Sequence, residues 1–129
     1  MIILDHVTMQ YPTGKKALDD VTFHINKGEF VFIVGSSGSG KTTLIKLLMK
    51  ELNPTKGEIT VDGMAYSKVK RKDIAMLRRK IGVVFQDFRL LRDRTVFENV
   101  AFAQQVIEKS IKEIRREVPA MLTMVGLAD

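Results

Sequence analysis

The chain has 129 residues, a formal net charge of +6, 45 % hydrophobic residues and no cysteine. This length suits one globular domain with a buried core, and the lack of cysteine excludes a disulfide framework. No apolar segment is long enough to cross a bilayer, and the N-terminal run 2–4 is too short for a signal peptide.

The N-terminal part of the chain predicts a β-hairpin. Residues 2–11 and 18–25 carry apolar and β-branched side chains in strand patterns, and residues 12–15, Pro-Thr-Gly-Lys, supply turn chemistry between them. We therefore expect an antiparallel pair of strands. His6 and His24 lie in this hairpin without other ligand-type residues clustered around them, so we interpret them as ordinary strand residues and not as metal ligands.

The stretch that organises the chain follows this hairpin. Residues 30–34 are an unbroken apolar run, which predicts a strand buried on both faces. Glycines and serines at 35–40 end this strand, and a helix with one apolar face is predicted from Lys41 onward. The residues expected on that face are Leu44, Ile45, Leu47 and Leu48. A strand, a loop of the form G-x-x-x-x-G-K-T and a helix together match a phosphate-binding P-loop at every position.

The residue types of this loop explain how it would hold a nucleoside triphosphate. Glycines let backbone N–H groups approach the phosphates, and the N-terminus of the helix directs further N–H groups and a positive dipole end at the same anion. Lys41 would reach the β- and γ-phosphates, the Thr42 hydroxyl would bind Mg²⁺, and Thr43 would donate to the α-phosphate. The candidate binding residues of the loop are Gly35, Ser36, Ser37, Gly38, Ser39, Gly40, Lys41, Thr42 and Thr43.

Beyond the P-loop helix the sequence predicts two further strands with a basic helix between them. Residues 53–57 end the first helix, and residues 58–61 alternate as a short strand that a turn at 62–63 closes. Residues 82–86 are another compact apolar strand. The residues expected on the buried side of the basic helix are Ile74, Leu77 and Ile81.

Two capping boxes predict the last two helices. Thr95 and Ser110 are each followed three residues later by a glutamate, which is the spacing of a helix N-terminus. In the second of these helices we expect Pro119 to cause a kink and Gly126 to be the residue that follows the C-cap. Its apolar stripe is predicted to be Ile111, Ile114, Val118 and Leu122.

The basic excess of the chain is confined to residues 67–80. There, Asp73 is the one acidic residue among seven basic ones: Lys68, Lys70, Arg71, Lys72, Arg78, Arg79 and Lys80. A solvated helix face explains this charge, and attraction to an anionic membrane surface is an alternative explanation. Nucleic acid is not expected as a partner, because no aromatic residues lie among the cations to stack on bases.

Three motifs in this order resemble the nucleotide-binding domain of ATP-binding cassette (ABC) transporters. Tyr11 would be the aromatic A-loop residue, the P-loop ending in Lys41 and Thr42 would be the Walker A motif, and Gln86 at the end of a strand would be the Q-loop. The segments 52–58 and 77–80 are also similar to that family. Residues 85–91 and 94–101 are similar to its bacterial cell-division members.

This resemblance implies an α/β fold of the P-loop NTPase type, with an N-terminal antiparallel β subdomain. Tyr11 would stack on adenine, and Gln86 would bind Mg²⁺ or position the attacking water and so act in catalysis with Lys41. The expected ligands are ATP and Mg²⁺. The expected partners are an integral-membrane subunit and, in a homodimer, a second ATP-binding domain, at the cytoplasmic face of the bacterial membrane.

The sequence departs from that family after Val100, where a signature motif, a Walker B aspartate, a catalytic glutamate and a switch histidine would be needed. We therefore expect residues 1–129 to be the N-terminal portion of a single ABC-type ATP-binding domain, truncated before these motifs, which binds ATP without hydrolysing it. Asp87 is a weaker candidate for the Walker B residue. Alternatives are a P-loop kinase of small molecules, with Asp87 holding Mg²⁺ through water, and a non-catalytic nucleotide-binding module.

Overall fold

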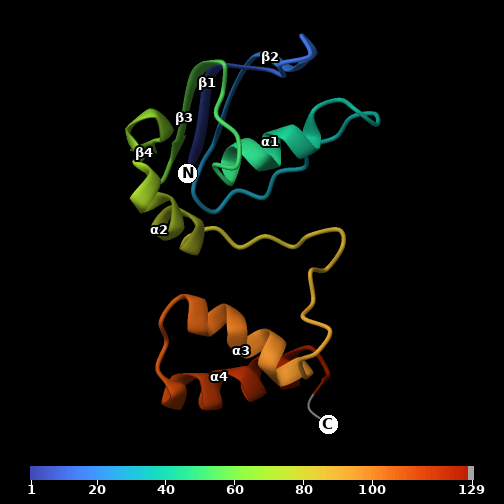
Figure 1. The fold of residues 1–129 in the computed structure, drawn as a ribbon, viewed down its shortest axis with the longest axis vertical. Coiled ribbons are helices and arrows are strands. Elements are labelled where there is room, and N and C mark those ends of the chain that lie inside the picture. Colours follow the sequence, from blue (N-terminus) through green and yellow to red (C-terminus); the bar gives the residue numbers. More distant parts are fainter. Residues whose placement is uncertain (128–129) are drawn as a thin grey trace. The chain divides into compact units, whose positions relative to one another are not determined.

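The computed structural model describes residues 1–127 and divides into two units, one of residues 1–81 and one that begins at residue 82. Each unit has a cluster of buried hydrophobic side chains of its own. The first unit contains all the described strands, and the second is helical (Figure 1). No helix among residues 1–127 has the length and apolar character that crossing a bilayer requires.

The first unit is built on a four-stranded sheet in the order β2-β1-β3-β4, in which each neighbouring pair is antiparallel. The bounds of the strands are β1 Ile2–Gln10, β2 Lys16–Ile25, β3 Lys56–Val61 and β4 Met64–Ala65. The hairpin predicted from the sequence is thus confirmed, and so is the short strand before the turn at 62–63. These four strands form the antiparallel β subdomain that the resemblance implied.

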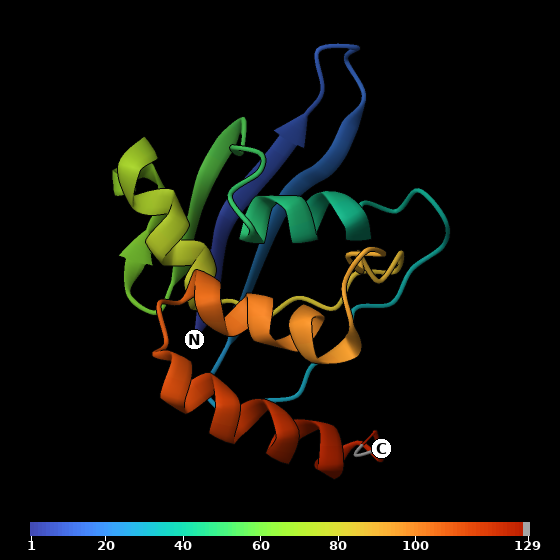
Figure 2. The ribbon, with the colours of Figure 1, turned by 60° about the horizontal axis from the view of Figure 1, so that its bottom comes forward.

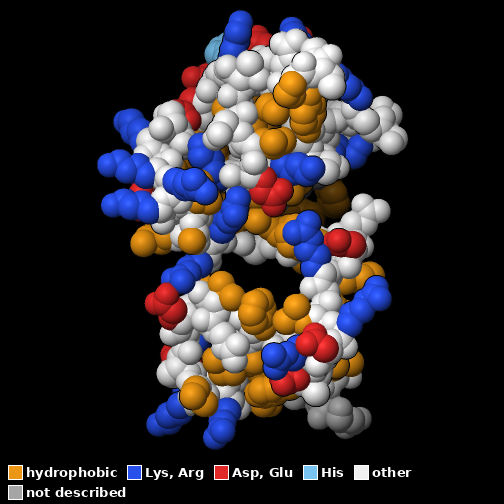
Figure 3. Space-filling model, viewed as in Figure 1, with side chains coloured by type: hydrophobic (Ala, Val, Ile, Leu, Met, Phe, Trp, Pro, Cys, Tyr) orange, Lys and Arg blue, Asp and Glu red, His pale blue; other side chains and the backbone are white. Residues whose placement is uncertain are grey.

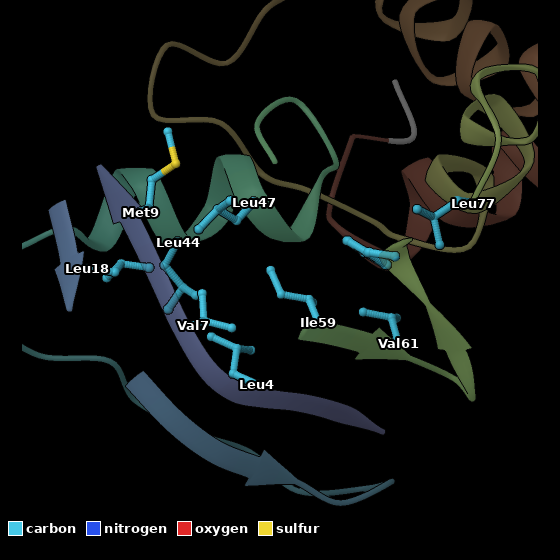
Figure 4. Close-up of a cluster of buried hydrophobic side chains, with 10 residues drawn as sticks. Leu4, Val7, Met9, Leu18, Leu44, Leu47, Ile59, Val61 and Leu77 are labelled. Carbon is cyan, nitrogen blue, oxygen red and sulfur yellow. The ribbon is translucent and has the colours of Figure 1, made fainter. Parts of the chain in front are cut away.

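Helix α1, Lys41–Leu48, lies against one face of this sheet (Figure 2). Leu44 and Leu47 of the helix point toward the buried strand residues, and Leu47 is fully excluded from solvent (Figure 4). The strand side of the cluster consists of Leu4, Val7, Met9, Leu18, Ile59 and Val61. Burial of these side chains fixes the position of α1, and therefore of the loop that precedes it. Ile45, expected on the same apolar face, is instead 44 % exposed.

The segment after β4 holds the C-terminal end of α1 in place. It contains two 3₁₀ turns, η1 Tyr66–Lys68 and η2 Arg71–Asp73, followed by the short helix α2, Ile74–Arg79. The buried Tyr66 hydroxyl donates to the carbonyl of Leu48, and burial raises the pKa of this phenol to about 12. Arg78 Nε donates to the Met49 carbonyl at 2.9 Å, where a cation also opposes the negative end of the helix dipole.

Buried residues of this segment join the core of the first unit as the sequence predicted. Leu77 is buried, while Ile74 and Ile81 are half-buried. The helix ends at Arg79, two residues before Ile81.

The second unit contains a pair of helices, α3 Val96–Val106 and α4 Ile111–Met124. Both predicted capping boxes are present, and Ala101, Ile114 and Val118 form the buried contact between the helices. Leu122 packs against them, whereas Ile111, predicted on the same stripe, is 72 % exposed.

Two further features of α4 were predicted. Pro119 lies inside the helix, and the kink expected there stays a prediction. The end of the helix is confirmed: Gly126 follows the C-cap with φ of 75°, and the Leu127 N–H closes the last turn on the Leu122 carbonyl at 2.8 Å.

Two predicted strands are wrong. Residues 30–34, expected to be a buried strand, and residues 82–86, expected to be a compact apolar strand, have no regular secondary structure. Phe32 is 78 % exposed and Val84 is 96 % exposed. A strand requires a neighbour to pair its backbone N–H and C=O groups, and none of the four described strands pairs with either segment. Their apolar composition is therefore not sufficient to make them strands in the described part of the chain.

Candidate functional site

The P-loop adopts a closed turn around the side chain of Lys41. The Lys41 ammonium donates to the carbonyls of Gly35 and Ser36 at 2.7 Å each, and to Ser39 Oγ at 3.2 Å. The lysine thus lies in the centre of the loop, where its charge faces backbone oxygens. An anion placed at this centre would replace these carbonyls as the partner of the ammonium group, since a charged acceptor binds it more strongly than a neutral one.

The N-terminus of α1 opens directly onto this loop. Gly40 is its N-cap residue, with φ of 96°, and no side chain caps the helix. A Cβ atom at this position would lie 2.3 Å from the carbonyl oxygen of Ala17 in β2, so the close approach of strand and loop requires glycine. The absence of a capping side chain leaves the first-turn N–H groups of α1 for an external acceptor.

A cavity of about 300 Å³ lies beside the loop in the first unit. The predicted site residues that line it are Tyr11, Ser37, Gly38, Gly40, Lys41, Thr42 and Thr43. The Tyr11 and Thr43 hydroxyls share a hydrogen bond of 3.0 Å, which brings the end of β1 to the first turn of α1. Thr43 is buried and Thr42 is exposed, so of these two hydroxyls only that of Thr42 is directly open to a metal ion.

The structure thus brings together most residues predicted for nucleotide binding. Gly35, Ser36 and Ser39 do not line the cavity but hold Lys41. Gln86 belongs to the second unit, where it is exposed, and its role at the phosphates stays a prediction.

Two residues of the cavity, Lys15 and Ala17, were not identified from the sequence. Lys15 is the last residue of the predicted turn and Ala17 follows it in β2, and the Tyr11 N–H closes the hairpin on the Lys15 carbonyl at 2.9 Å. The pairing of the hairpin is the signal that could have placed Lys15 beside Tyr11. Lys15 is thus a second basic residue, beside Lys41, in the lining of the cavity.

Residues 18–129 match the family model described as ABC transporter. The chain belongs to the ABC transporter family. This confirms the resemblance on which the A-loop, Walker A and Q-loop assignments rest. The fold class of the chain is that of an ABC ATPase cassette.

Curated relatives in this family include cell division ATP-binding proteins named FtsE. The chain is 50 % identical to that of Mycobacterium tuberculosis over 99 % of its own length, and 44 % identical to that of Escherichia coli over its full length. These alignments cover 56 % and 58 % of the two relatives. The chain therefore spans little more than half the length of the curated ABC proteins that it matches.

Solved structures of ABC proteins have a fold similar to that of this chain. The ATP-binding cassette MJ0796, in a dimeric post-hydrolysis state bound to ADP and Pi, has a TM-score of 0.83 at 35 % identity, over 96 % of this chain and 56 % of that one. The cassette cbiO1 from Clostridium perfringens, part of an ABC transporter complex, has a TM-score of 0.85 at 31 % identity, over 98 % of this chain and 50 % of that one. The ABC fold class predicted from the sequence is confirmed.

Proposed function

We propose that this chain binds ATP together with Mg²⁺ through the P-loop and Tyr11. The observation that carries the proposal is the cavity in which Tyr11, Lys41 and Thr42 meet at the uncapped N-terminus of α1. Lys41 would bind the β- and γ-phosphates and the Thr42 hydroxyl would be a ligand of Mg²⁺, which suits an exposed oxygen donor beside phosphates. Tyr11 would stack on adenine, a contact worth about 1–3 kcal/mol.

In the intact protein this chain would be the N-terminal part of an ATP-hydrolysing subunit of a membrane complex that acts in cell division. The names of the FtsE relatives support the cell-division role. The partner would be an FtsX-like integral-membrane subunit, and the ATP-binding subunits would form a homodimer, as the dimeric MJ0796 cassette suggests. The subunit would then lie at the cytoplasmic face of the membrane.

Hydrolysis would depend on more than the described residues supply. Lys41 and Thr42 stabilise the bound phosphates and metal, and Gln86 would help to position the attacking water. Catalysis of phosphoryl transfer further needs a group that orients this water and donors that bind the transition state. We therefore expect the 129-residue chain to bind ATP and to hydrolyse it too slowly to measure.

Titration of the chain with fluorescent ATP and GTP, with and without Mg²⁺, tests the binding site. Lys41→Ala should weaken ATP binding about 10- to 100-fold, because a charge-assisted contact to phosphate is lost. Lys46→Ala is the matched control, since Lys46 is an exposed lysine of the same helix that does not line the cavity. Equal affinities of wild type and Lys41→Ala would contradict the proposal.

A phosphate-release assay on the same proteins tests the second expectation. Mg²⁺-dependent turnover that Lys41→Ala abolishes would show that the chain already holds its catalytic groups, and Asp87 would be the first residue to substitute. Transfer of phosphate to an added small-molecule acceptor would instead identify a kinase. Binding without either reaction is the expected result.

A further inference from the structure

The segment that follows β4 forms a second concave surface in the first unit, separate from the phosphate cavity. A groove of about 400 Å³ lies between β4, the two 3₁₀ turns and α2. Its apolar lining includes Met64, Val69, Met76 and Leu77, and Lys68 and Lys80 also line it. We call this groove, together with the cations of residues 68–72, the basic groove.

The charges of the basic groove are almost all of one sign. Lys68, Lys70, Arg71 and Lys72 are exposed, and within residues 1–127 none of them forms a hydrogen bond or ion pair through its side chain. Asp73 is the acidic residue of the lining. In Figure 3, Lys and Arg side chains gather over the part of the first unit that Figure 1 labels β4. The uncompensated charge fits an anionic partner.

Arg78 differs from these four cations because its side chain has hydrogen-bond partners within the protein. Its guanidinium donates to the carbonyls of Met49 and Lys50, at 2.9 Å and 3.3 Å, and so serves the packing of α1. Arg78 on α2 therefore has a structural role, whereas the four cations on the turns before α2 have no side-chain partner within residues 1–127.

An apolar surface lies directly beside these cations. Met76 is 65 % exposed although it lines the groove, and Val69 is half-buried. Exposed apolar groups with a rim of cations are the features by which peripheral proteins adhere to bilayers that contain anionic lipids.

We propose that the basic groove docks on the surface of an anionic phospholipid bilayer. Three of the four unpaired cations are lysines, which act as mobile point charges and suit a plane of lipid phosphates better than the fixed carboxylates of one protein. No aromatic side chain lines the groove to stack on nucleic-acid bases. The contact is a direct one with lipid, and it requires no membrane-protein partner.

Flotation of the full chain with vesicles tests this surface. Equimolar phosphatidylglycerol–phosphatidylcholine vesicles are the probe, and pure phosphatidylcholine vesicles are the uncharged comparison. Each basic residue near such a surface should raise the affinity about five-fold, so Lys68→Gln/Lys70→Gln/Lys72→Gln should bind about 100-fold more weakly. Adhesion should also weaken as salt is added, because screening acts over about 8 Å at physiological ionic strength.

Two further variants separate the groove from net charge and from misfolding. Lys46→Gln/Lys56→Gln/Lys112→Gln removes the same charge from exposed lysines outside the groove, and it should keep most of the affinity. Met76→Ser leaves every charge in place and should weaken binding about five-fold through loss of the apolar contact. Circular dichroism confirms that each variant keeps its secondary structure.

Strong binding by the wild type and the control, with loss in the groove variants, supports the proposal. Equal losses in the groove triple and the control triple would overturn it, because adhesion would then follow net charge alone. Absence of binding to the anionic vesicles would overturn it as well. Binding to an acidic amphipathic peptide without binding to vesicles would assign the groove to a protein partner and reject the lipid assignment.

Discussion

The N-terminus of α1 differs from those of α3 and α4 in whether side chains cap its first-turn backbone N–H groups. Thr95 and Ser110 cap the two later helices with complete capping boxes, so their own side chains satisfy the first-turn donors. At α1 the N-cap residue is Gly40, no side chain caps the helix, and no acidic residue stands in the first turn.

The difference separates a structural helix end from a binding one. A helix whose donors are satisfied internally offers nothing to an anion, and a carboxylate in its first turn repels one. At the N-terminus of α1 the N–H donors and the positive end of the helix dipole can bind an anionic ligand, and Lys41 adds a full positive charge. Helix N-termini of one chain are thus capped by side chains at α3 and α4 and left open at α1, and the experiments below test this contrast.

The largest effect is expected at Gly40. Gly40→Ala should destabilise the first unit by about 3 kcal/mol, because it forces a positive φ on alanine and drives Cβ against the Ala17 carbonyl at 2.3 Å. It should also abolish nucleotide binding, since relief of the overlap moves the loop. Urea unfolding and ATP titration measure the two effects.

Gly38→Ala is the matched control in the same loop. Gly38 also has a positive φ, of 80°, but a Cβ there meets no atom within 4 Å. Its cost should be about 1 kcal/mol, from backbone strain alone. Equal destabilisation by the two substitutions would show that contact with β2 does not fix the loop.

A smaller effect is expected from the capping residues. Thr95→Ala and Ser110→Ala should each cost the helical unit about 1 kcal/mol, because each leaves first-turn N–H groups without an acceptor. Amide hydrogen exchange over residues 96–124 measures this loss.

Thr42→Ala in the first turn of α1 completes the contrast. Thr42 is exposed and caps nothing, so this change should leave stability unaltered while weakening Mg²⁺-dependent ATP binding. A stability loss as large as that of Thr95→Ala would contradict the view that the end of α1 is kept for a ligand.

Much of this contrast could be predicted from the sequence, because its determinants are local. The capping boxes span four residues, the P-loop eight, and the hairpin turn lies between its two strands. Lys41 was identified from the P-loop pattern and Tyr11 from the family resemblance, both before their elements were known to meet. The contact of Tyr11 with α1, through the Thr43 hydroxyl, depends on how α1 packs on the sheet, which no local pattern states.

The wrong predictions share a physical cause, which is dependence on distant partners. Residues 30–34 and 82–86 have strand composition, yet a strand also needs a paired neighbour, and no described strand pairs with them. The role of Arg78 was missed likewise. Its charge predicted a solvated face, whereas its guanidinium holds carbonyls of the turn that follows α1.

The smallest effect is expected from pH, and it again distinguishes the capped helices from α1. The backbone N–H and hydroxyl of Thr95 hold the pKa of Glu98 below its usual range, and the Ser110 hydroxyl and N–H do the same for Glu113. A lowered folded-state pKa means that the stabilisation is complete above the ordinary glutamate value, near 4.3, and is lost as the pH falls through the lowered value. Helicity of the second unit should therefore decline in that acid range.

The experiment must separate these two glutamates from Glu117, whose pKa Lys109 also lowers and which titrates in the same direction. The quantity to measure is therefore the difference between wild type and a variant. Circular dichroism of wild type against Glu98→Gln/Glu113→Gln isolates the caps, since glutamine keeps an acceptor oxygen without titrating. Superimposable acid profiles would show that these carboxylates do not stabilise the helices through their charge.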